Sequence, residues 1–197
     1  ATTKEQLGQE NPATLALADA LRKEKLKIFG LGPITNLATV LKLHPELAQQ
    51  VSGVILCMGR QANEKFVVGT SKKLLMDYNY EKDPEAMAVL LKTEIPLVLA
   101  GFPASSPIHI TKKDVRKIKR SGTVGNKWLA TQLNEWLFCW KLALGAKYFI
   151  PFDAVTIGYY THPELFVIEE NVSVQAIEAP KDSKFKNKDN NPNKPYL

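Results

Sequence analysis

Apolar residues recur along the chain in two patterns that predict alternating helices and strands. Spacings of three and four residues predict helices over 12–24 and 33–51, each burying one face. The segment "LKIFGLG" (26–32) predicts a short buried strand, and the continuous apolar run "SGVILCMG" (52–59) is typical of a strand in a parallel sheet that is covered on both faces. The first 59 residues therefore predict the order helix, strand, helix, strand.

The rest of the chain continues this alternation. The further expected elements are, in chain order, a loop or hairpin over 61–76, a helix over 84–93, a strand over 95–102, helices over 111–145 with a break at "SGTVG", a helix from Phe152, a strand over 165–179 and a polar loop after Pro180. Helices that alternate with strands predict an α/β fold, with a mostly parallel sheet flanked by helices. We expect a single domain over residues 1–197.

The composition is that of an ordinary globular protein. Of the 197 residues, 45% are hydrophobic and 23% are charged, and no apolar run reaches the length of a membrane span. The net charge of +6 is concentrated in runs such as "KKDVRKIKR" (112–120). That run has no interleaved aromatic residue or glycine, so a solvated helix face explains it better than a nucleic-acid site.

Two cysteines are too few for a disulfide framework or a zinc site. Cys57 and Cys139 both occur in apolar runs, so we expect two buried thiols.

Ligands of parallel α/β sheets bind beyond the carboxyl ends of the strands. The segments at those positions are Leu31-Gly32-Pro33, Met58-Gly59-Arg60, Gly101-Phe102-Pro103 and Phe152-Asp153. None of them forms a glycine-rich phosphate loop or a nucleophile elbow.

The segment "MDYNYEKDPEA" (76–86) has oxygen-bearing side chains at alternate positions. It fails as an EF-hand loop, because Lys82 and Ala88 stand where the required glycine and glutamate would be. Asp83-Pro84-Glu85 instead has the pattern of a helix start, with an N-cap, a proline and an acid. "DYNY" is then an extended loop beside a helix entry, on which Asp77 and Asn79 point the same way.

Four segments in this order and spacing resemble the nucleoside hydrolases, calcium-dependent N-ribohydrolases of the inosine-uridine type. They are "IFGLGPITNLATVLKLHPEL", "VILCMG", "DYNYEKDPEAMAVLL" and "PFDAVTIGYYTHPELF". The resemblance implies an enzyme that hydrolyses the N-glycosidic bond of a ribonucleoside, with a Ca²⁺-bound water as nucleophile. It also implies a mostly parallel α/β sheet with the metal at the bottom of the pocket.

The resemblance assigns a metal site and a ribose site. Asp153 matches a metal-binding aspartate, and Leu31 matches a residue whose backbone carbonyl binds the metal. Met58, Asp77 and Asn79 match residues that contact ribose. Without the resemblance, Asp153 would be explained equally well as a helix N-cap, and Met58 and Leu31 as core residues.

The resemblance also assigns aromatic residues to the nucleobase. Trp136 and Trp140 are four residues apart on one helix face, where the family has aromatic residues over the base. Tyr78 is a further candidate near the base. Core packing is the ordinary alternative for both tryptophans.

Three departures from the family pattern bear on catalysis. The aspartate-rich N-terminal motif, which supplies the family's catalytic base, is absent, so the catalytic residues stay unassigned and we expect a fragment, a processed piece or a degenerate homologue. Phe152 replaces a histidine that protonates the leaving base in some members, and Arg60 replaces a glycine.

Three function classes compete: a nucleoside hydrolase, a hydrolase-like domain that only binds a nucleoside or sugar, and a nucleic-acid binder. We favour the enzyme, with a small nucleoside as substrate, Ca²⁺ as cofactor, and neither nucleic acid nor membrane as partner. A purine is the expected base, although the sequence does not fix the base, the compartment or whether the chain forms a homo-oligomer.

Overall fold

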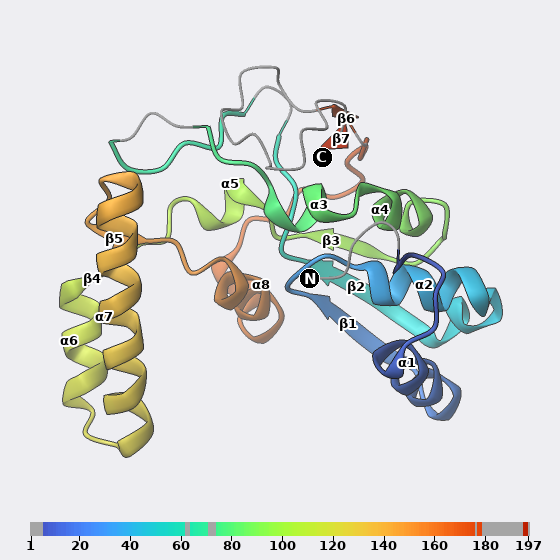
Figure 1. Cartoon of the computed structure of the whole chain (residues 1–197), viewed down its shortest axis with the longest axis horizontal. Helices are drawn as coiled ribbons and strands as arrows, with labels where there is room; N and C mark the ends of the chain where they lie inside the picture. The colour runs from blue at the N-terminus through green and yellow to red at the C-terminus, as the bar shows by residue number, and fades with distance from the viewer. Residues whose placement is uncertain (1–5, 62–63, 71–73, 176, 179–194, 197) are drawn as a thin grey trace.

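The computed structural model describes residues 6–61, 64–70, 74–175, 177–178 and 195–196. At its centre is a parallel three-stranded sheet in the order β1 (Leu26–Gly30), β2 (Val51–Leu56) and β3 (Leu97–Leu99) (Figure 1). Ile28 lies opposite Val54 in the first pair of strands, and Ile55 lies opposite Val98 in the second. The predicted α/β fold with a parallel sheet flanked by helices is confirmed.

Alternate residues of the strands enter different layers, as the pleat of a sheet requires. Val54 and Leu56 join the main core with residues of the first helices, whereas Phe29 points the other way and meets Tyr160 of α8 edge to face at 5.3 Å. The helices and turns around the sheet are α1 (Pro12–Lys23), α2 (Thr35–Leu43), η2 (Pro45–Gln50), α3 (Tyr78–Lys82), α4 (Pro84–Leu90), α8 (Phe152–Thr161) and η3 (Pro163–Leu165).

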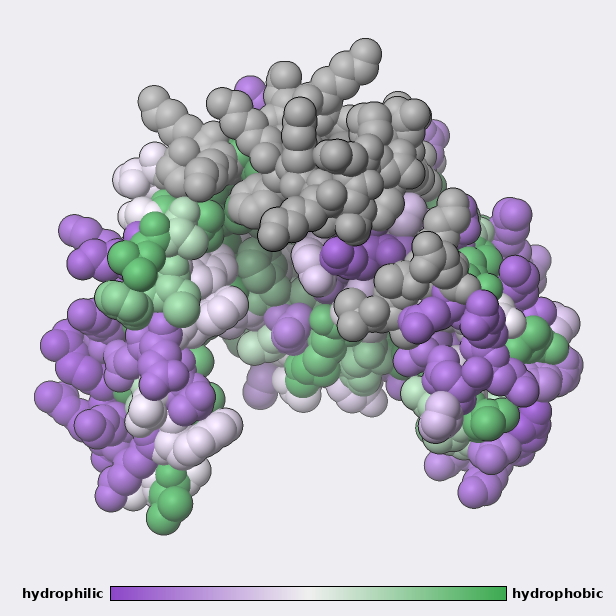
Figure 2. Space-filling view, viewed as in Figure 1, coloured by the Kyte–Doolittle hydropathy of each residue, from purple (hydrophilic) through white to green (hydrophobic). Residues whose placement is uncertain are grey.

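A second core lies beside the sheet. Phe102 of α5 (Phe102–Ser105) and Phe149 of β5 (Tyr148–Phe149) pack there against α7 (Val124–Leu144) and Val115 of α6 (Lys112–Arg120). β5 pairs with β4 (Ile110–Thr111). Helices α6 and α7 form a hairpin that extends away from the sheet (Figure 1) and stands as a lobe of its own in Figure 2.

The expected single helix over 33–51 is interrupted. α2 ends at Leu43, and a 3₁₀ helix begins at Pro45. His44 between them is outside the helical region, with φ −133° and ψ 68°, because a proline disfavours helical backbone in the residue before it.

The expected strand over 165–179 is wrong for most of its length. Residues 166–175 are irregular, and of the described residues in this segment only Ile177–Glu178 (β6) pairs, with Pro195–Tyr196 (β7). Val167 is 99% exposed and Asn171 has a left-handed φ of 57°, so the alternation here follows no sheet face. Most of the polar tail after Pro180 lies outside the described residues. Part of the expected loop or hairpin over 61–76 also lies outside them, and in its described part Val67 forms an antiparallel β-bridge with Leu74.

The expectation of two buried thiols is half wrong. Cys57 is buried, but Cys139 is exposed because it lies on the face of α7 that points away from the second core. No helix in the described part of the chain is long and apolar enough to cross a membrane.

A buried polar link ties two of the sequence motifs together. Asp83 caps α4 by accepting a hydrogen bond from the backbone N–H of Ala86 at 3.0 Å, and its other oxygen accepts one from the hydroxyl of Thr35 at the start of α2. Both side chains are almost fully buried. The conjunction of "GPITN" and "DPEA" in one sequence thus has a structural cause, because the two motifs meet in space.

This link predicts a large loss of stability for Asp83→Ala. The substitution removes an N-cap and leaves the Thr35 hydroxyl and one N–H buried without a partner, which should cost about 2–4 kcal/mol. Thr35→Val, which removes only the hydroxyl, should cost less, about 1–2 kcal/mol. Urea unfolding of both variants and of the double variant measures the coupling, and strictly additive losses would contradict the link.

Candidate active site

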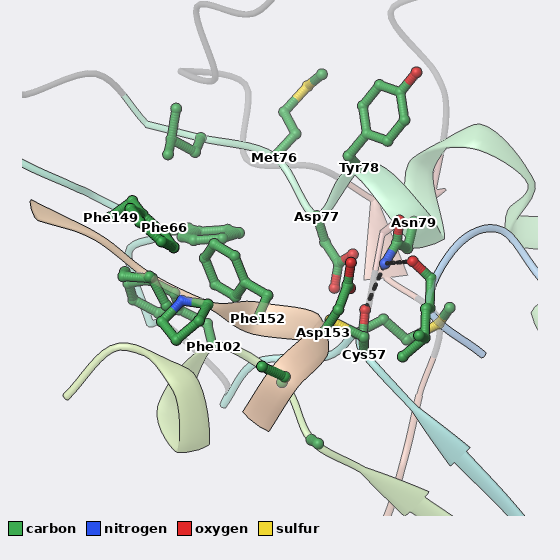
Figure 3. A pocket seen from close by; sticks show the side chains of 18 of the residues that line it. Cys57, Phe66, Met76, Asp77, Tyr78, Asn79, Phe102, Phe149, Phe152 and Asp153 are labelled. Atoms are coloured by element: carbon green, nitrogen blue, oxygen red, sulfur yellow. Dashed lines mark hydrogen bonds between the residues drawn. The ribbon is translucent and has the colours of Figure 1, made fainter. Parts of the chain in front are cut away.

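A pocket of about 600 Å³ opens at the carboxyl ends of the parallel strands. Leu31 follows β1, Met58 follows β2 and Gly101 follows β3, and all three line it. The start of α8 and the segment before α3 supply further walls (Figure 3), and helix α7 supplies another through Trp136 and Trp140. A cavity of this size suits a small organic ligand.

The pocket brings together every residue to which the sequence analysis gave a role. They are Leu31, Met58, Asp77, Tyr78, Asn79, Trp136, Trp140 and Asp153, with Phe152 beside them. Their individual roles stay predictions, but residues from five separate stretches of sequence share one cavity.

Asp77 is held by the backbone. Its carboxylate accepts hydrogen bonds from the N–H groups of Gly59 at 2.6 Å and Tyr80 at 3.2 Å. The second bond caps α3, so the expected extended loop over "DYNY" is wrong: an aspartate at this position starts a helical turn instead. Burial raises the pKa of Asp77 above its ordinary value, and the backbone N–H groups and Arg60 offset part of that rise.

Two glycines allow the ends of β2 and β3 to approach each other. The N–H of Phe102 donates to the carbonyl of Gly59 at 2.9 Å. A Cβ atom on Gly101 would lie 1.9 Å from that carbonyl oxygen, and Gly59 itself has a left-handed φ of 103°. Both positions therefore require glycine, which keeps the Gly59 N–H aimed at Asp77.

Asn79 connects the ends of β1 and β2. Its amide donates to the carbonyl of Cys57 at 2.7 Å and, more weakly, to the carbonyl of Leu31 at 3.4 Å (Figure 3). The same Leu31 carbonyl is the predicted metal ligand, so Asn79 helps to fix its direction. Because Asn79 lies inside α3, its contacts arise from helical geometry and not from the strand-like alternation that the sequence suggested.

The contacts of Asp77 predict different outcomes for two substitutions. Asp77→Ala leaves the Gly59 N–H buried and unpaired and should lower the free energy of unfolding by about 2–4 kcal/mol, whereas Asp77→Asn keeps an acceptor and should cost about 1 kcal/mol.

The stability that Asp77 provides should also depend on pH. The raised pKa means that the folded protein binds the proton of the Asp77 carboxyl more tightly than the unfolded chain does. The protonated Asp77 carboxyl therefore makes its full contribution to the free energy of unfolding below the pKa of the unfolded chain, about 4. This contribution is lost as pH rises through the raised pKa of the folded protein.

The check is chemical denaturation of wild type and Asp77→Asn at a series of pH values. The stability of wild type relative to the asparagine variant should fall as pH rises above about 4. A difference that is constant with pH would show that burial does not perturb this carboxyl.

The polar floor of the pocket contains Asp153 and Cys57. Figure 3 shows Asp77 and Asp153 extending into the same part of the pocket, beside Cys57. The pKa of the Cys57 thiol is raised to about 12, chiefly by burial, with smaller contributions from hydrogen bonding to Asp153 and from the charges of both aspartates, and a hydrogen bond with Thr156 offsets part of this rise. The thiol is therefore neutral at physiological pH and is a poor nucleophile.

One wall of the pocket is aromatic. Phe66 packs against Phe102 at 4.1 Å between ring centroids and against Phe152 at 5.6 Å. Trp140 meets Phe149 at 6.3 Å and Phe152 at 6.5 Å. Sequence reasoning missed Phe66 and Phe149. Phe66 lies in an irregular segment without periodicity, so no sequence signal marked it.

The two tryptophans differ in their surroundings. Trp140 is 8% exposed and belongs to the second core, so core packing accounts for part of its position. Trp136, one turn earlier on α7, is 52% exposed and lines the pocket without being buried. Trp136 is therefore freer than Trp140 to stack on a ligand.

The donor chemistry of the pocket suits a hard cation, but the donor set is small. Asp153 offers a carboxylate and Leu31 a backbone carbonyl, the oxygen ligands that Ca²⁺ prefers. Within the described residues, no group of three or more His, Cys, Asp or Glu side chains could hold a metal. Two oxygens are fewer than the six to eight that Ca²⁺ takes, so these residues fit part of a calcium site.

A parallel α/β sheet with a polar and aromatic pocket at its carboxyl edge is the architecture of many small-ligand enzymes. Residues 1–193 match the family described as "Inosine-uridine preferring nucleoside hydrolase". The chain belongs to this nucleoside hydrolase family.

Curated relatives agree with this membership. The chain is 27% identical over 157 residues to the pyrimidine-specific ribonucleoside hydrolase RihA of Citrobacter koseri, covering 78% of this chain and 48% of that protein. It is 27% identical over 165 residues to RihA of Escherichia coli O1:K1, covering 82% and 51%. The chain thus spans about half the length of the curated relatives it matches.

Solved structures share the fold. A purine-preferring ribonucleoside hydrolase from Gardnerella vaginalis superposes with a TM-score of 0.66 at 21% identity, covering 81% of this chain and 50% of that one. A plant nucleoside hydrolase gives a TM-score of 0.68 at 22% identity, covering 82% and 53%.

Proposed function

We propose that the full-length protein hydrolyses the N-glycosidic bond of ribonucleosides, releasing a free base and ribose. The observation that carries the proposal is the single pocket lined by all the residues that the family resemblance assigns to sugar, base and metal. The two curated relatives described above, both named ribonucleoside hydrolases, support the same reaction.

In this proposal Asp77 and Asn79 bind the ribose. Asp77 accepts hydrogen bonds from the backbone N–H groups of Gly59, Tyr80 and Asn79, and a carboxylate has about four acceptor sites in all, so capacity remains for a sugar hydroxyl. The amide nitrogen of Asn79 donates to backbone carbonyls, which leaves its oxygen as an acceptor. The backbone bonds hold both side chains in place before the sugar arrives, which reduces the ordering needed on binding.

The aromatic wall is proposed to bind the base. Trp136 and the phenylalanine cluster offer flat apolar faces on which a base can stack. We keep purine as the expected base, because such a wall suits a large ring system. Both curated relatives are named pyrimidine-specific and one structural neighbour is named purine-preferring, so the names of the relatives do not by themselves support a purine.

Ca²⁺ is the proposed cofactor, with Asp153 and the Leu31 carbonyl among its ligands. The chemistry that Ca²⁺ supplies when bound is to hold and polarise a water molecule. The remaining oxygens must come from water, from sugar hydroxyls or from protein groups other than these two.

The test is direct detection of both products. The full-length protein is incubated with inosine, uridine or nitrophenyl riboside in the presence of Ca²⁺, and free base and reducing sugar are measured. Equal amounts of base and ribose support the proposal. Tight nucleoside binding by calorimetry without product would support instead a hydrolase-like domain that only binds its ligand, and neither binding nor turnover would contradict both functions.

A further inference from the structure

The wall proposed to bind the base is a cluster of aromatic rings. Phe66 lies 4.1 Å from Phe102 and 5.6 Å from Phe152 between ring centroids. Figure 3 shows these rings gathered at one side of the cavity, with Asp77 and Asn79 at the other. A base that lies against this wall meets several aromatic rings, while the polar groups stay on the side proposed for the sugar.

The described walls of the pocket contain no basic side chain. The chain has 26 Lys and Arg residues and a net charge of +6, yet no Lys, Arg or His is among the described residues that line the cavity. The charged side chains that line it are Asp77 and Asp153. Burial raises the pKa of Asp77 and the charge of Arg60 offsets part of that rise, but Arg60 is outside the lining residues. A positively charged ligand therefore meets no like charge in these walls.

The aromatic wall also lacks a group that can protonate a leaving base. Phenylalanine has no ionisable proton, and the indole N–H of tryptophan donates hydrogen bonds without ionising. Tyr78 is 57% exposed and extends away from the phenylalanines (Figure 3). An acid that protonates the leaving group is typically worth about 10² to 10⁴ in rate. A neutral purine, which leaves as an anion unless it is protonated, does without that assistance on this wall.

A base with a fixed positive charge needs no such acid. In a purine nucleoside alkylated at N7, the ring is cationic, and the C1′–N9 bond breaks with its electron pair passing to the ring, which leaves as a neutral molecule. The oxygen of a water molecule bonds to C1′, and one proton of that water is released to solvent. The products are ribose, the neutral alkylated base and one proton. Hydrolysis of the unmodified nucleoside releases no net proton, because the departing base takes it up.

Aromatic faces also attract a cationic ring. A positive charge within about 6 Å of the centroid of a Trp, Tyr or Phe ring is drawn to its face. Trp136 lines the wall and is half exposed, so its face is accessible to a ligand. Ca²⁺ bound at Asp153 would offset the charge of the two carboxylates, so the attraction comes from the rings. The cavity of about 600 Å³ has room for an alkyl group on the base.

We propose that this pocket prefers nucleosides whose base carries a fixed positive charge, such as purine nucleosides alkylated at N7. The proposal names a substrate class for the hydrolysis proposed above and rests on that activity for the rates, whereas the binding preference can be measured without turnover.

The first experiment measures binding of two bases that carry a methyl group in place of ribose and cannot be hydrolysed. These are 9-methyladenine, which is neutral, and the 7,9-dimethyladeninium cation. Calorimetry with the full-length protein should show the cation binding roughly 2- to 30-fold more tightly. Trp136→Leu should bring this ratio towards one, whereas Trp128→Leu, an exposed tryptophan of α7 outside the pocket, should leave it unchanged. Equal affinities in wild type, or no binding of either compound, overturn the proposal.

The second experiment compares hydrolysis of adenosine and 7-methyladenosine, which differ by one methyl group and one charge. With uncatalysed hydrolysis subtracted, kcat/KM should be at least about 10²-fold higher for 7-methyladenosine, the low end of what an acid contributes. A pH indicator should record one proton per turnover with 7-methyladenosine and none with adenosine. An equal or lower kcat/KM for 7-methyladenosine overturns the proposal.

Phe152→His supplies the matched variant, because histidine can donate a proton near neutral pH. It should raise kcat/KM for adenosine but not for 7-methyladenosine, so the ratio between the two substrates should fall at least about 10-fold. Phe152→Leu removes the ring without adding an acid and should not raise either rate. An unchanged ratio in Phe152→His would overturn the account of the preference. If neither nucleoside is hydrolysed while the cation still binds more tightly, the proposed hydrolysis fails and the binding preference stands.

Discussion

Asp153→Asn should lower kcat/KM for nucleoside hydrolysis at least about 10³-fold while leaving the fold intact. The side chain is exposed in the first turn of α8, and its substitution removes no buried packing. Asparagine has the same shape but no charge, and a neutral amide is a much weaker ligand for a hard divalent cation than a carboxylate. Loss of a group that stabilises charge at the reacting centre typically costs 10²–10³ in rate, and loss of the metal costs more.

Calcium binding gives this prediction a second measurement besides activity. Isothermal calorimetry of the full-length protein should show tight Ca²⁺ binding in wild type and a clear loss in Asp153→Asn, whereas Glu164→Gln, an exposed carboxylate on η3, serves as the control. We expect only weak binding by the 197-residue chain alone, since Asp153 and the Leu31 carbonyl supply two oxygens. Unchanged Ca²⁺ affinity in Asp153→Asn would show that this aspartate is not a metal ligand.

The sheet was predictable from sequence because its middle strand, β2, is almost entirely buried, whereas β1 and β3 are only half-buried. The continuous runs before Leu31 and after Val51 have few alternatives to a parallel strand, and both strands form. The expected strand over 165–179 failed because alternation alone does not supply a partner, and Val167 and Asn171 have no neighbouring strand. A local hydrophobic pattern predicts a strand well where the segment is buried in a sheet, and poorly where it lies at the surface.

The contents of the pocket were predictable, but the conformation of its polar residues was not. Strand ends in a parallel sheet meet at one edge, so Leu31 and Met58 could be placed together in advance. Asp153 reaches the same pocket from the start of α8, after β5, which pairs with β4 outside the parallel sheet. The helical turn at Asp77 is capped locally by the N–H of Tyr80, but the alternation of polar residues suggested extended backbone instead. The hydrogen bond from the N–H of Gly59, 18 residues away, could not be foreseen. Phe66 reaches the aromatic wall through a similar long-range contact, and no local pattern encodes such a contact.

Trp136→Ala should slow hydrolysis of purine nucleosides more than that of nitrophenyl riboside. A departing purine carries negative charge on its ring nitrogens and gains from a proton, but Phe152 cannot donate one. Stacking on Trp136 is the route that the pocket offers for assisting the base. Base–aromatic stacking contributes about 1–3 kcal/mol, so the loss on a purine substrate should be roughly 5- to 150-fold. Nitrophenolate leaves without a proton, and its rate should change less.

The structure decides which tryptophan gives the cleaner measurement. Trp140→Ala would open a cavity in the second core and cost about 3–5 kcal/mol of stability, which would obscure any effect on the base. Trp136 is half exposed, so its removal leaves that core intact, and Trp140→Phe serves as the matched variant that keeps a ring in the wall. The measurement is kcat/KM for inosine and nitrophenyl riboside with wild type and both variants. Equal losses on the two substrates in Trp136→Ala would mean that the ring shapes the pocket without assisting departure of the base.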